Sequence, residues 1–422
     1  MESAFGQAMS RIVVIGAGVI GLSVAEQCAR RGHRVTVIEQ APEQRGSSLG
    51  NAGMVVPSHF VPLAAPGMVA LGLKWMWNPE SAFYIQPRFD WDLITWAWQF
   101  WRACTRERVE RAAPLLRDLH LASREAYAQL ADSGEDFGLV RHGLLMLCKT
   151  RHALDDETRT AEKANALGVP AEVLDAQQTA ELDPHVTMDV AGSVFFRKDC
   201  HLQPARYVGT LEQRLRASGA EMFFDASVTG GRREGGRLRA VETTRGEVEG
   251  DEFVLAGGAW SPELMRELGL RLPMQAGKGY SVTLPHPIEL PQRCSILTEA
   301  RVAVTPMGGA LRVGGTMEIA GLNDRVNLRR VEGILRALPQ YFPNFRREHF
   351  DGLQPWHGLR PCSPDGLPYL GRTKAAENLV VATGHAMMGL SLAPITGELA
   401  AQLVDREPPR LDLSLLAPDR YA

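Results

Sequence analysis

The run Gly16-Ala17-Gly18-Val19-Ile20-Gly21 most strongly limits how this chain can fold. It follows a short apolar stretch, Arg11 to Ile15, and precedes a stretch with helical character from Leu22 to about Arg31. A strand that turns through glycines into a helix is the first half of a dinucleotide-binding βαβ unit. The first glycine permits the turn, the second lets the backbone approach a pyrophosphate, and the third lets helix and strand pack closely. The helix then presents the positive end of its dipole to the phosphates.

The second strand is expected from Arg34 to Glu39. A carboxylate at the end of this strand can accept hydrogen bonds from both hydroxyls of an adenosine ribose. The same charge disfavours a 2′-phosphate, which argues against NADP. With strand, helix, second strand and acid in order, the sequence predicts dinucleotide binding rather than a glycine-rich turn in an unrelated α/β fold.

Three further features favour FAD over NAD. Small polar residues from Arg45 to Met54 can wrap a second phosphate and the ribityl chain. Phe253 to Gly258 is expected to be a strand that ends in glycines beside the dinucleotide. Val381 to Ser391 is expected to be a strand-to-helix turn that aims backbone N–H groups at the flavin pyrimidine edge. A second GxGxxG is absent from the sequence, so we expect the electrons to come from a bound substrate.

The residues expected to hold the cofactor come from all of these segments. They are Gly16, Gly18, Val19, Ile20, Gly21, Glu39, Gln40, Ser47, Ser48, Asn51, Ala52, Gly53, Met54, Val228, Gly257, Gly258, Gly384, Met388, Gly389, Leu390 and Ser391.

Composition excludes several other functions. The 422 residues carry 46 Lys and Arg against 49 Asp and Glu, without a basic run, so nucleic acid is not an expected partner. The six cysteines and the histidines lack paired ligand spacing, so no metal site is expected and the thiols are expected to be reduced. Neither a signal peptide nor a membrane span is evident, so the expected location is cytoplasmic.

The sequence resembles the flavin amine oxidoreductases of the D-amino acid oxidase and glycine oxidase type. Within them it is most similar to bacterial D-amino acid dehydrogenases of the small-subunit type, and then to enzymes that oxidise cis-4-hydroxy-D-proline. The likeness covers most of the chain. It rests on VVIGAGVIGLSVA with Glu39, SSLGNAGMV, AAPG at 64–67, KGYSVTL at 278–284, RVGGTME at 312–318, GLRPCSPDGLPYLGR at 358–372 and GHAMMGLS at 384–391. The chain departs from the family at Ala386, which replaces the second glycine of a common GHG.

The resemblance implies an activity and a first catalytic residue. Arg360 matches the arginine with which the family binds the substrate carboxylate, because a guanidinium grips a carboxylate through two parallel hydrogen bonds. The alternative is an arginine that braces the loop after residue 355. Tyr280 is expected to contact the carboxylate or amine, or else to be a core tyrosine. His385 and His59 are expected to border the substrate, or else to be structural.

The implied fold is α/β, with a Rossmann-like FAD-binding domain interleaved with an α+β substrate domain that contains a mixed or antiparallel sheet. The expected division is 1–60, 195–262 and 355–422 for FAD, and 61–194 and 263–354 for substrate. The expected function is FAD-dependent oxidation of D-amino acids, with cis-4-hydroxy-D-proline or D-proline first. A hydride would pass from Cα to flavin N5, and the electrons then to a quinone or another acceptor of the respiratory chain. The FAD is expected to be non-covalent.

Several alternatives stay open. They are an oxidase that uses O2 on amino acids, glycine or sarcosine, a flavin subunit of a hetero-oligomeric amine dehydrogenase, and an enzyme acting on 2-hydroxy acids. The sequence also leaves open an oligomer and a peripheral contact with the inner face of the membrane. Six of the eight tryptophans lie between Trp75 and Trp101. They can pack a helix onto the body or form a membrane-docking face.

Overall fold

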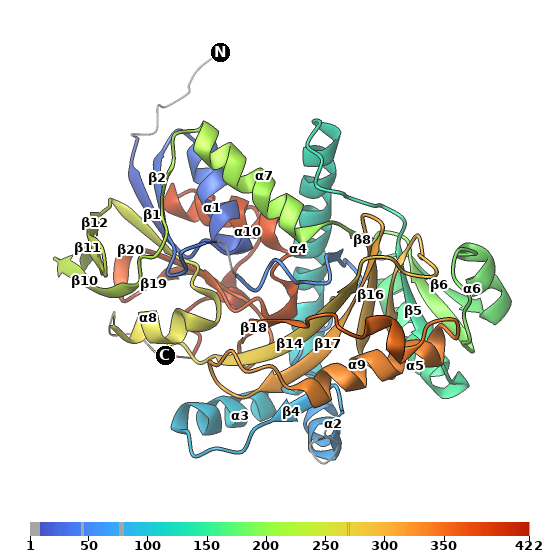
Figure 1. Cartoon of the computed structure of the whole chain (residues 1–422). Helices are drawn as coiled ribbons and strands as arrows, with labels where there is room; N and C mark the ends of the chain where they lie inside the picture. Colours follow the sequence, from blue (N-terminus) through green and yellow to red (C-terminus); the bar gives the residue numbers. More distant parts are fainter. Residues whose placement is uncertain (1–8, 44–45, 76–79, 268, 270, 422) are drawn as a thin grey trace.

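The computed structural model describes residues 9–43, 46–75, 80–267, 269 and 271–421 (Figure 1). A six-stranded sheet holds the glycine turn, in the order β19-β20-β13-β1-β2-β9, and all its neighbours are parallel except β19 and β20. The strands are β1 (Arg11–Ile15), β2 (Arg34–Ile38), β9 (Glu221–Phe223), β13 (Glu252–Leu255), β19 (Tyr369–Thr373) and β20 (Ala376–Thr383). Their apolar runs are buried because both faces of a parallel sheet are covered.

Helices pack around the glycine turn on this sheet. α1 (Val19–Arg30) contacts both α7 (Pro204–Ala217) and α10 (Ala393–Val404). The packing of α10 is close, because a Cβ at Gly397 would lie 2.5 Å from the carbonyl oxygen of Ser23 in α1. The first and the last helices of the chain therefore lie side by side over the sheet.

A larger mixed sheet forms the other part of the molecule, at the right in Figure 1. Its order is β18-β14-β17-β16-β15-β5-β7-β6, and β4 pairs with β17. The strands are β4 (Phe83–Ile85), β5 (Leu144–Cys148), β6 (Ala171–Asp175), β7 (Gly192–Phe196), β14 (Gln275–Leu284), β15 (Cys294–Leu297), β16 (Val302–Met307), β17 (Ala310–Ile319) and β18 (Trp356–Cys362). The helix α9 (Leu328–Tyr341) packs on one face of this sheet.

The remaining elements connect and cover the two sheets. They are α2 (Met68–Trp75), α3 (Trp91–Ala103), α4 (Arg106–Asp132), α5 (Arg151–Ala166), α6 (Ala176–Leu182), α8 (Ser261–Glu267), the pair β3 (Met54–Val55) and β8 (Cys200–His201), and the small sheet β10 (Val228–Glu234), β11 (Arg237–Thr243) and β12 (Gly246–Glu249). Short 3-10 turns include η1 (Gly258–Trp260) and η3 (Ala386–Met388).

The architecture confirms the expected fold class, with one correction to the expected strands. The apolar pattern of residues 220–228 in the sequence predicts one strand. In the structure β9 ends at Phe223, the chain turns through Asp225 at φ +55°, and β10 begins at Val228. The expected domain boundary at 355 would part β18 from β14, with which it forms an antiparallel ladder. The hydrogen-bonded ladders show that the chain leaves the larger sheet after Cys362, at the end of β18, and enters the six-stranded sheet with β19. The domain division itself stays a prediction.

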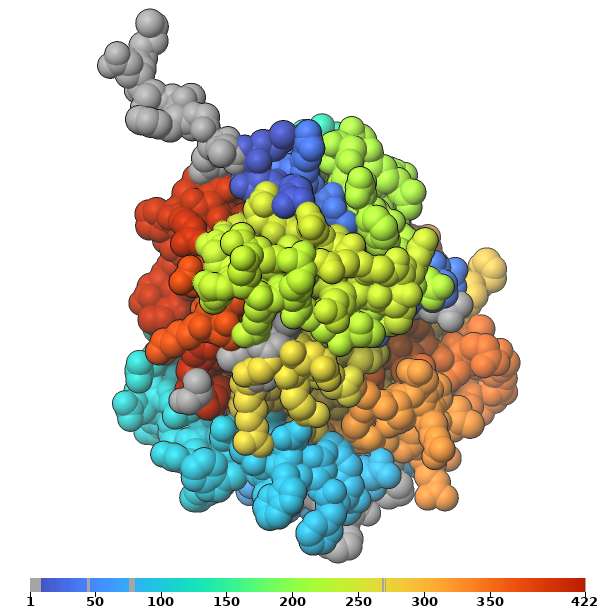
Figure 2. Space-filling model, turned by 90° about the vertical axis from the view of Figure 1, so that its left-hand side faces the viewer, coloured from blue at the N-terminus to red at the C-terminus, as the bar shows by residue number. Residues whose placement is uncertain are grey.

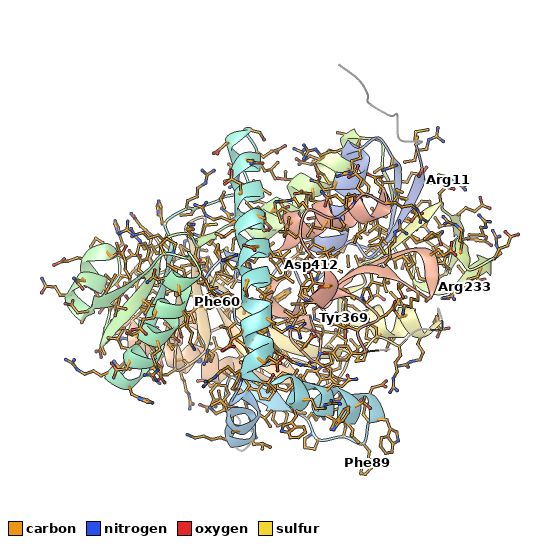
Figure 3. All side chains as sticks on the ribbon, turned by 180° about the vertical axis from the view of Figure 1, so that it is seen from behind. Arg11, Phe60, Phe89, Arg233, Tyr369 and Asp412 are labelled. Carbon is orange, nitrogen blue, oxygen red and sulfur yellow. The ribbon has the colours of Figure 1, made fainter. Side chains whose placement is uncertain are left out.

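The tryptophan-rich helix α3 has two different faces. Trp96 is buried, stacks on Phe100 and donates its Nε1–H to the carbonyl oxygen of Cys362 at 2.8 Å. The opposite line is exposed, including Trp98 and Trp101, and Figure 3 shows Phe89 projecting from the loop before the helix. In Figure 2 the light-blue atoms of this region form one end of the molecule. Trp77 lies outside the described residues.

Candidate active site

The three glycines of the first turn have different physical roles. Gly16 has φ +108°, and a Cβ there would lie 2.5 Å from the carbonyl oxygen of Ala256. A Cβ at Gly21 would lie 1.8 Å from the carbonyl oxygen of Gly16. The fold itself therefore demands these two glycines. Gly18 has φ −65°, and a Cβ there would meet nothing within 4 Å. Its missing side chain leaves a cradle that a pyrophosphate can fill.

The N-terminus of α1 fits an anionic group. Gly18 caps the helix without a side-chain hydrogen bond, so backbone N–H groups of the first turn remain for a ligand. The hydroxyl of Ser48 accepts the N–H of Val19 at 3.2 Å and keeps its own proton to donate. Ile20 follows Val19 in this first turn and packs against the core.

Glu39 follows β2 directly, at the position expected for a ribose-binding carboxylate. Its two oxygens accept the backbone N–H groups of Ala17 at 2.8 Å and Ala41 at 3.0 Å. A carboxylate held in this way retains lone pairs for two further hydroxyl donors. The next residue, Gln40, is exposed. The donor set of this turn therefore fits an adenosine diphosphate group.

The segment after Glu39 runs from the glycine turn to the larger sheet. The hydroxyl of Ser47 accepts the N–H of Leu359 and donates to its carbonyl oxygen, both at 2.9 Å. Asn51 accepts the N–H of Gly53 at 2.8 Å. Gly53 has φ +75° and lies against β8, where a Cβ would be 2.2 Å from the carbonyl oxygen of Leu202. The segment therefore connects α1 with the strand that carries Arg360.

Ala52, Met54, Val228, Gly257 and Gly258 border the same region. Ala52 packs against the core cluster that contains Met54, and Met54 pairs with His201. Val228 packs with the cluster that holds Ile15 and Ile38. Gly257 and Gly258 follow β13, and a Cβ at Gly258, where φ is +56°, would meet nothing within 4 Å.

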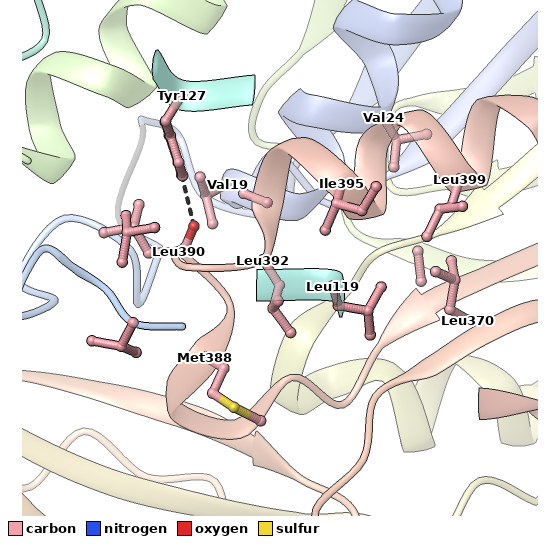
Figure 4. Packing of buried hydrophobic residues seen from close by; sticks show 14 of the residues in the cluster. Val19, Val24, Leu119, Tyr127, Leu370, Met388, Leu390, Leu392, Ile395 and Leu399 are labelled. Carbon is pink, nitrogen blue, oxygen red and sulfur yellow. Dashed lines mark hydrogen bonds between the residues drawn. The ribbon is translucent and has the colours of Figure 1, made fainter. Parts of the chain in front are cut away.

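The last strand-to-helix turn is braced by α4. Tyr127 donates its hydroxyl proton to the carbonyl oxygen of Leu390 at 2.6 Å (Figure 4). The two ring nitrogens of His120 lie 2.8 Å from Oγ of Ser391 and 3.3 Å from Sδ of Met388. Ser391 also accepts the N–H of Val56 at 3.0 Å. Sequence reasoning missed His120 and Tyr127, because no local motif marks them.

The same turn stores backbone strain. Gly384 has φ +78° and lies against Tyr369, while Gly389 has room for a Cβ, 3.7 Å from Cβ of His385. Ala386 has φ +48°, in the left-handed region where an alanine costs about 1 kcal/mol relative to glycine. The residue at which the chain departs from the GHG pattern thus keeps the backbone conformation that a glycine would adopt.

Arg360 lies on β18, opposite Gly277 of β14. Its guanidinium crosses Gly279, where a Cβ would be 2.1 Å from Nη1. Nη1 donates to the carbonyl oxygen of Thr316 at 2.5 Å. Within the described part of the chain, no carboxylate forms an ion pair with Arg360 and its other N–H donors have no acceptor. Burial lowers the pKa of this guanidinium because it removes water from the charged group. An anionic ligand would replace that lost stabilisation of the charge.

A β-bulge shapes the backbone under Arg360. The register of β14 and β17 shifts between Lys278 and Tyr280, and Thr316 in the bulge has φ +69°. A β-branched residue in this conformation is strained, and such strain occurs at sites where the geometry serves function. Here the bulge turns the Thr316 carbonyl towards the guanidinium, and this fixes the direction of the remaining donors.

Tyr280 lies on the other face of β14. Opposite residues of an antiparallel pair share a face, so Arg360 shares one with Gly277 and Gly279, whereas Tyr280 belongs to the alternate set. Tyr280 is 1% exposed, packs with the core cluster under α9, and donates to Glu318 at 2.7 Å. The structure therefore does not bring its hydroxyl to Arg360, and the core interpretation describes its position.

The two expected histidines both belong to the region of the last turn: His385 lies within the turn, and the segment that carries His59 bonds the turn through Val56. His385 pairs with Cys362 through a backbone bridge, two residues from Arg360. Its Nε2 bonds Thr396 at 3.0 Å, and its buried Nδ1 has no partner among the described residues. An orphaned nitrogen of this kind fits a site completed by a bound group. His59 is partly buried and bonds Oγ of Ser58 through Nδ1 at 3.0 Å.

Arg312 is a further residue that sequence reasoning did not single out. Its Nη1 donates to the carbonyl oxygens of Leu49 at 3.0 Å and Asn51 at 2.8 Å, and its Nε donates to Thr283 at 3.0 Å. Burial lowers its pKa. This arginine holds the cofactor segment on the larger sheet. Arg312 is the first residue of the RVGGTME motif, and this motif was the feature of the sequence that could have pointed to it.

The cysteines and the possible metal ligands are scattered in the described residues. The six cysteines are free, and no three His, Cys, Asp or Glu side chains of the described chain gather as metal ligands. The arrangement offers a dinucleotide cradle, a strained turn and a partly buried arginine without a carboxylate partner among the described residues.

Comparison with known proteins decides the family. Residues 11–403 match the family described as FAD dependent oxidoreductase, DAO. This chain belongs to that family. FAD is therefore the dinucleotide that the cradle, Glu39 and the two glycine turns fit, and the chain is an FAD-dependent oxidoreductase.

Relatives span nearly the whole chain. A D-amino acid dehydrogenase of Agrobacterium fabrum is 32% identical and aligns over 97% of this chain and 99% of its own length. One of Cereibacter sphaeroides is 33% identical over 97% and 95%. The fold is similar to glycine oxidase from Geobacillus kaustophilus, with a TM-score of 0.78, 25% identity and coverage of 98% and 100%. It is also similar to L-proline dehydrogenase from P. horikoshii, with a TM-score of 0.74, 20% identity and 98% of both chains.

We expect the fold to lose stability in mild acid because its buried histidines stay neutral. Burial lowers the pKa of His120 and His385 to about 3, and of His59 and His201 to about 4. In the unfolded chain these rings bind protons below about pH 6.5. The contribution of these neutral rings to the free energy of unfolding is therefore fully present above pH 6.5. It falls as the pH drops towards 4, by up to about 2 kcal/mol per ring at pH 5.

Thermal unfolding of the FAD-loaded protein at pH 7 and pH 5 measures this effect. His201→Gln is expected to reduce the difference in Tm between the two pH values. His152→Gln, at a side chain that is 88% exposed, is the matched control and should leave the difference unchanged. An equal difference in all three proteins would contradict the prediction.

Proposed function

We propose that this enzyme oxidises small or cyclic D-amino acids at Cα, with cis-4-hydroxy-D-proline and D-proline as the first candidates. The partly buried guanidinium of Arg360 carries the proposal. It lacks a carboxylate partner among the described residues, and its strand is bound to Ser47 on one side and to His385 on the other. The relatives named D-amino acid dehydrogenase support the D-amino acid class.

The chemistry needs few groups from the chain. FAD, which we propose to be held non-covalently by the glycine turn and Glu39, would supply the acceptor for the hydride of the substrate Cα when bound. Arg360 fixes the carboxylate with two parallel hydrogen bonds and so orients the Cα–H bond. The product imine hydrolyses, or persists as a pyrroline when the amine lies in a ring.

The choice of a cyclic amine rests on the apolar residues near the turn. Met54 is 9% exposed and Met388 is 5% exposed. Both side chains are flexible and can close around a small ring. A ring amine has no large side chain to place, so an apolar wall of this kind suits it.

The acceptor in the proposal is a quinone or another non-oxygen acceptor. The nearest competing function is an oxidase that passes electrons to O2. The similarity of the fold to a glycine oxidase supports this alternative. A flavin subunit that needs a partner chain would also hold FAD in this cradle. An enzyme for 2-hydroxy acids is a third competing function, because the same arginine would grip their carboxylate.

An anaerobic visible spectrum tests the proposal. Addition of cis-4-hydroxy-D-proline is expected to bleach the flavin band, and a dye or quinone should restore it much faster than air does. D-Proline, other D-amino acids, sarcosine and 2-hydroxy acids form the comparison panel. A flavin that no D-amino acid bleaches would overturn the proposal. Rapid recovery in air would favour the oxidase.

We further propose that α3 docks this enzyme on an anionic membrane surface. Its exposed apolar residues follow helical spacing: Trp91, Ile94, Trp98 and Trp101. The guanidinium of Arg102 lies 4.7 Å from the ring centre of Trp98, and further exposed arginines begin α4. An aromatic line beside basic residues suits a membrane interface. No helix among the described residues is long and apolar enough to span a bilayer.

Vesicle sedimentation tests this docking. Trp98→Glu combined with Trp101→Glu is expected to weaken binding to anionic vesicles at least about tenfold, since burial of one large side chain is worth about 2 kcal/mol. Turnover with a water-soluble dye should not change. Ile288→Glu, at a residue 64% exposed in another part of the surface, is the control. Unaltered binding of the double variant would contradict the docking role.

A further inference from the structure

A buried carboxyl, a hydroxyl and an imidazole are connected in one line beside the last turn. Asp199 is 1% exposed and lies just before β8. Its two oxygens accept the N–H of Ser58 at 3.1 Å and the hydroxyl of Ser58 at 2.5 Å. The same hydroxyl oxygen lies 3.0 Å from Nδ1 of His59. The proposed function uses neither Asp199 nor Ser58.

The order of the three groups couples the charge of Asp199 to the tautomer of His59. When Asp199 is ionised it only accepts, so Ser58 gives it the hydroxyl proton and receives Nδ1–H from His59. Nε2 is then a free base. When Asp199 is protonated all the bonds can reverse, and Nε2 carries the proton. A proton that enters at Nε2 therefore leaves the line at the carboxyl.

The free end of this line is open. Within the described chain, Nε2 of His59 has no hydrogen-bond partner. It is also not among the fully buried polar atoms that lack a partner, so it is accessible. The segment that carries His59 is bound to the last strand-to-helix turn, because the N–H of Val56 donates a hydrogen bond to Oγ of Ser391. His120, which also bonds Ser391, is close enough to interact electrostatically with His59.

We propose that Asp199, Ser58 and His59 form a proton relay that takes the proton from the ammonium group of the bound amino acid. The inference rests on the proposed function. An amino acid reaches the enzyme as a zwitterion, and its nitrogen needs a free lone pair before Cα can lose a hydride. His59 Nε2 accepts the ammonium proton, Nδ1–H passes to Ser58, and the serine proton passes to Asp199. The products are a neutral amine, the other neutral tautomer of His59, and a carboxylic acid.

Burial, more than charge, favours the carboxyl over the imidazole as the resting place of the proton. Burial raises the pKa of Asp199 to about 7, although Ser58 and the charge of Arg124 oppose this rise. Burial and the charge of Arg301 lower the pKa of His59 to about 4. The other titratable groups that face the relay are His120 from α4, Cys200 from β8 and Cys294 from β15.

In this relay His59 is the group assigned to contact the substrate, through its Nε2, and is therefore the proposed catalytic residue. Ser58 and Asp199 act through it. Asp199→Asn keeps the size of the side chain and an oxygen for Ser58, but it cannot take up the proton. Near pH 7 we expect this variant to slow flavin reduction by cis-4-hydroxy-D-proline by about a hundredfold, which is within the range of general-base catalysis. The deficit should vanish as the pH approaches the pKa of the substrate amine, because the amine then arrives neutral.

Ser58→Ala, which breaks the line in the middle, should show the same pH-selective loss and serves if Asp199→Asn does not fold. Asp183→Asn is the matched control. Asp183 is fully buried and accepts backbone N–H groups of Gln292 and Arg293, away from the site. Any effect of this control should be independent of pH. A deficit of equal size at every pH in Asp199→Asn and Ser58→Ala, or no deficit in either, would overturn the relay.

A measurement without turnover separates the relay from the proposed function. 2-Methyl-D-proline has no Cα–H and cannot be oxidised. At pH 8 its binding to the FAD-loaded protein is expected to produce the infrared band of a protonated carboxyl, and Asp199→Asn should abolish that band. If D-amino acids reduce the flavin of the wild-type protein but the carboxyl band does not appear, the relay alone is refuted. A wild-type flavin that no D-amino acid reduces refutes the proposed function and the relay with it.

Discussion

Arg360→Ala is expected to raise KM for the amino acid about a hundred- to a thousandfold and to leave FAD bound. Removal of one partner from a buried ion pair costs about 3–5 kcal/mol, and each 1.4 kcal/mol is a factor of ten in affinity. The guanidinium lies across Gly279, with one N–H on Thr316 and the others without an acceptor in the described chain. The measurement is steady-state kinetics with a dye, together with the flavin content of the purified variant.

Two further variants locate the effect in the guanidinium. Arg360→Lys keeps the charge but loses the two parallel hydrogen bonds, so its KM should lie between those of the wild type and the alanine variant. Arg372→Ala removes a partly buried arginine of β19, in the other sheet, that binds Glu252 and the carbonyl oxygen of Leu403. This control should leave KM unchanged. A wild-type KM in Arg360→Ala would exclude Arg360 as the carboxylate-binding residue.

Gly18→Ala is expected to lower FAD affinity by roughly ten- to a hundredfold, which corresponds to about 1–3 kcal/mol for an overpacked contact. The apoprotein should remain as stable as the wild type. A Cβ at Gly18 would meet no protein atom within 4 Å, and its φ of −65° is accessible to alanine. Only a bound pyrophosphate would meet the new methyl group. Flavin titration of the apoprotein and its thermal unfolding measure the two quantities.

Gly209→Ala is the matched control for this experiment. Gly209 lies in α7, and a Cβ there also has nothing within 4 Å. Alanine should stabilise that helix by up to about 1 kcal/mol without any change in FAD affinity. Gly16→Ala should instead destabilise the apoprotein, because its Cβ would strike the carbonyl of Ala256. Unaltered FAD binding by Gly18→Ala would refute the cradle.

The sequence was most informative where chemistry and fold depend on neighbours in the chain. The glycine turn, β2 and Glu39 follow local rules of turns, strands and helix dipoles, and the structure places them as expected. Ala386 is another such case. Its departure from GHG marks a turn that takes φ +48°. The strand β18 escaped prediction, because Gly358 and Pro361 interrupt its pattern. An edge strand tolerates a proline, and β18 lies at the edge of its sheet.

Other features depend on pairing between distant segments. The face that Tyr280 occupies is set by the register of β14 with β18 and by the bulge opposite β17. One residue of shift would have turned its hydroxyl to the side of Arg360. Asp199 and Ser58 meet across 141 positions of the chain, and His120 meets Ser391 across 271. No periodicity or motif encodes such contacts, since each partner looks like an ordinary polar residue in its own segment.

The order of strands in the six-stranded sheet has a consequence for how a cell makes this enzyme. Its central strand β1 is synthesised first, while its neighbour β13 comes far later and β20 almost last. When everything before Tyr369 has left the ribosome, the glycine turn, Glu39 and α7 exist, but α10, which also packs on α1, does not. Pairing over such long separations is slow and leaves unpaired strand edges exposed meanwhile. A truncated chain that lacks β20 and α10 should therefore need chaperones and bind no flavin, and cofactor loading should follow the synthesis of α10.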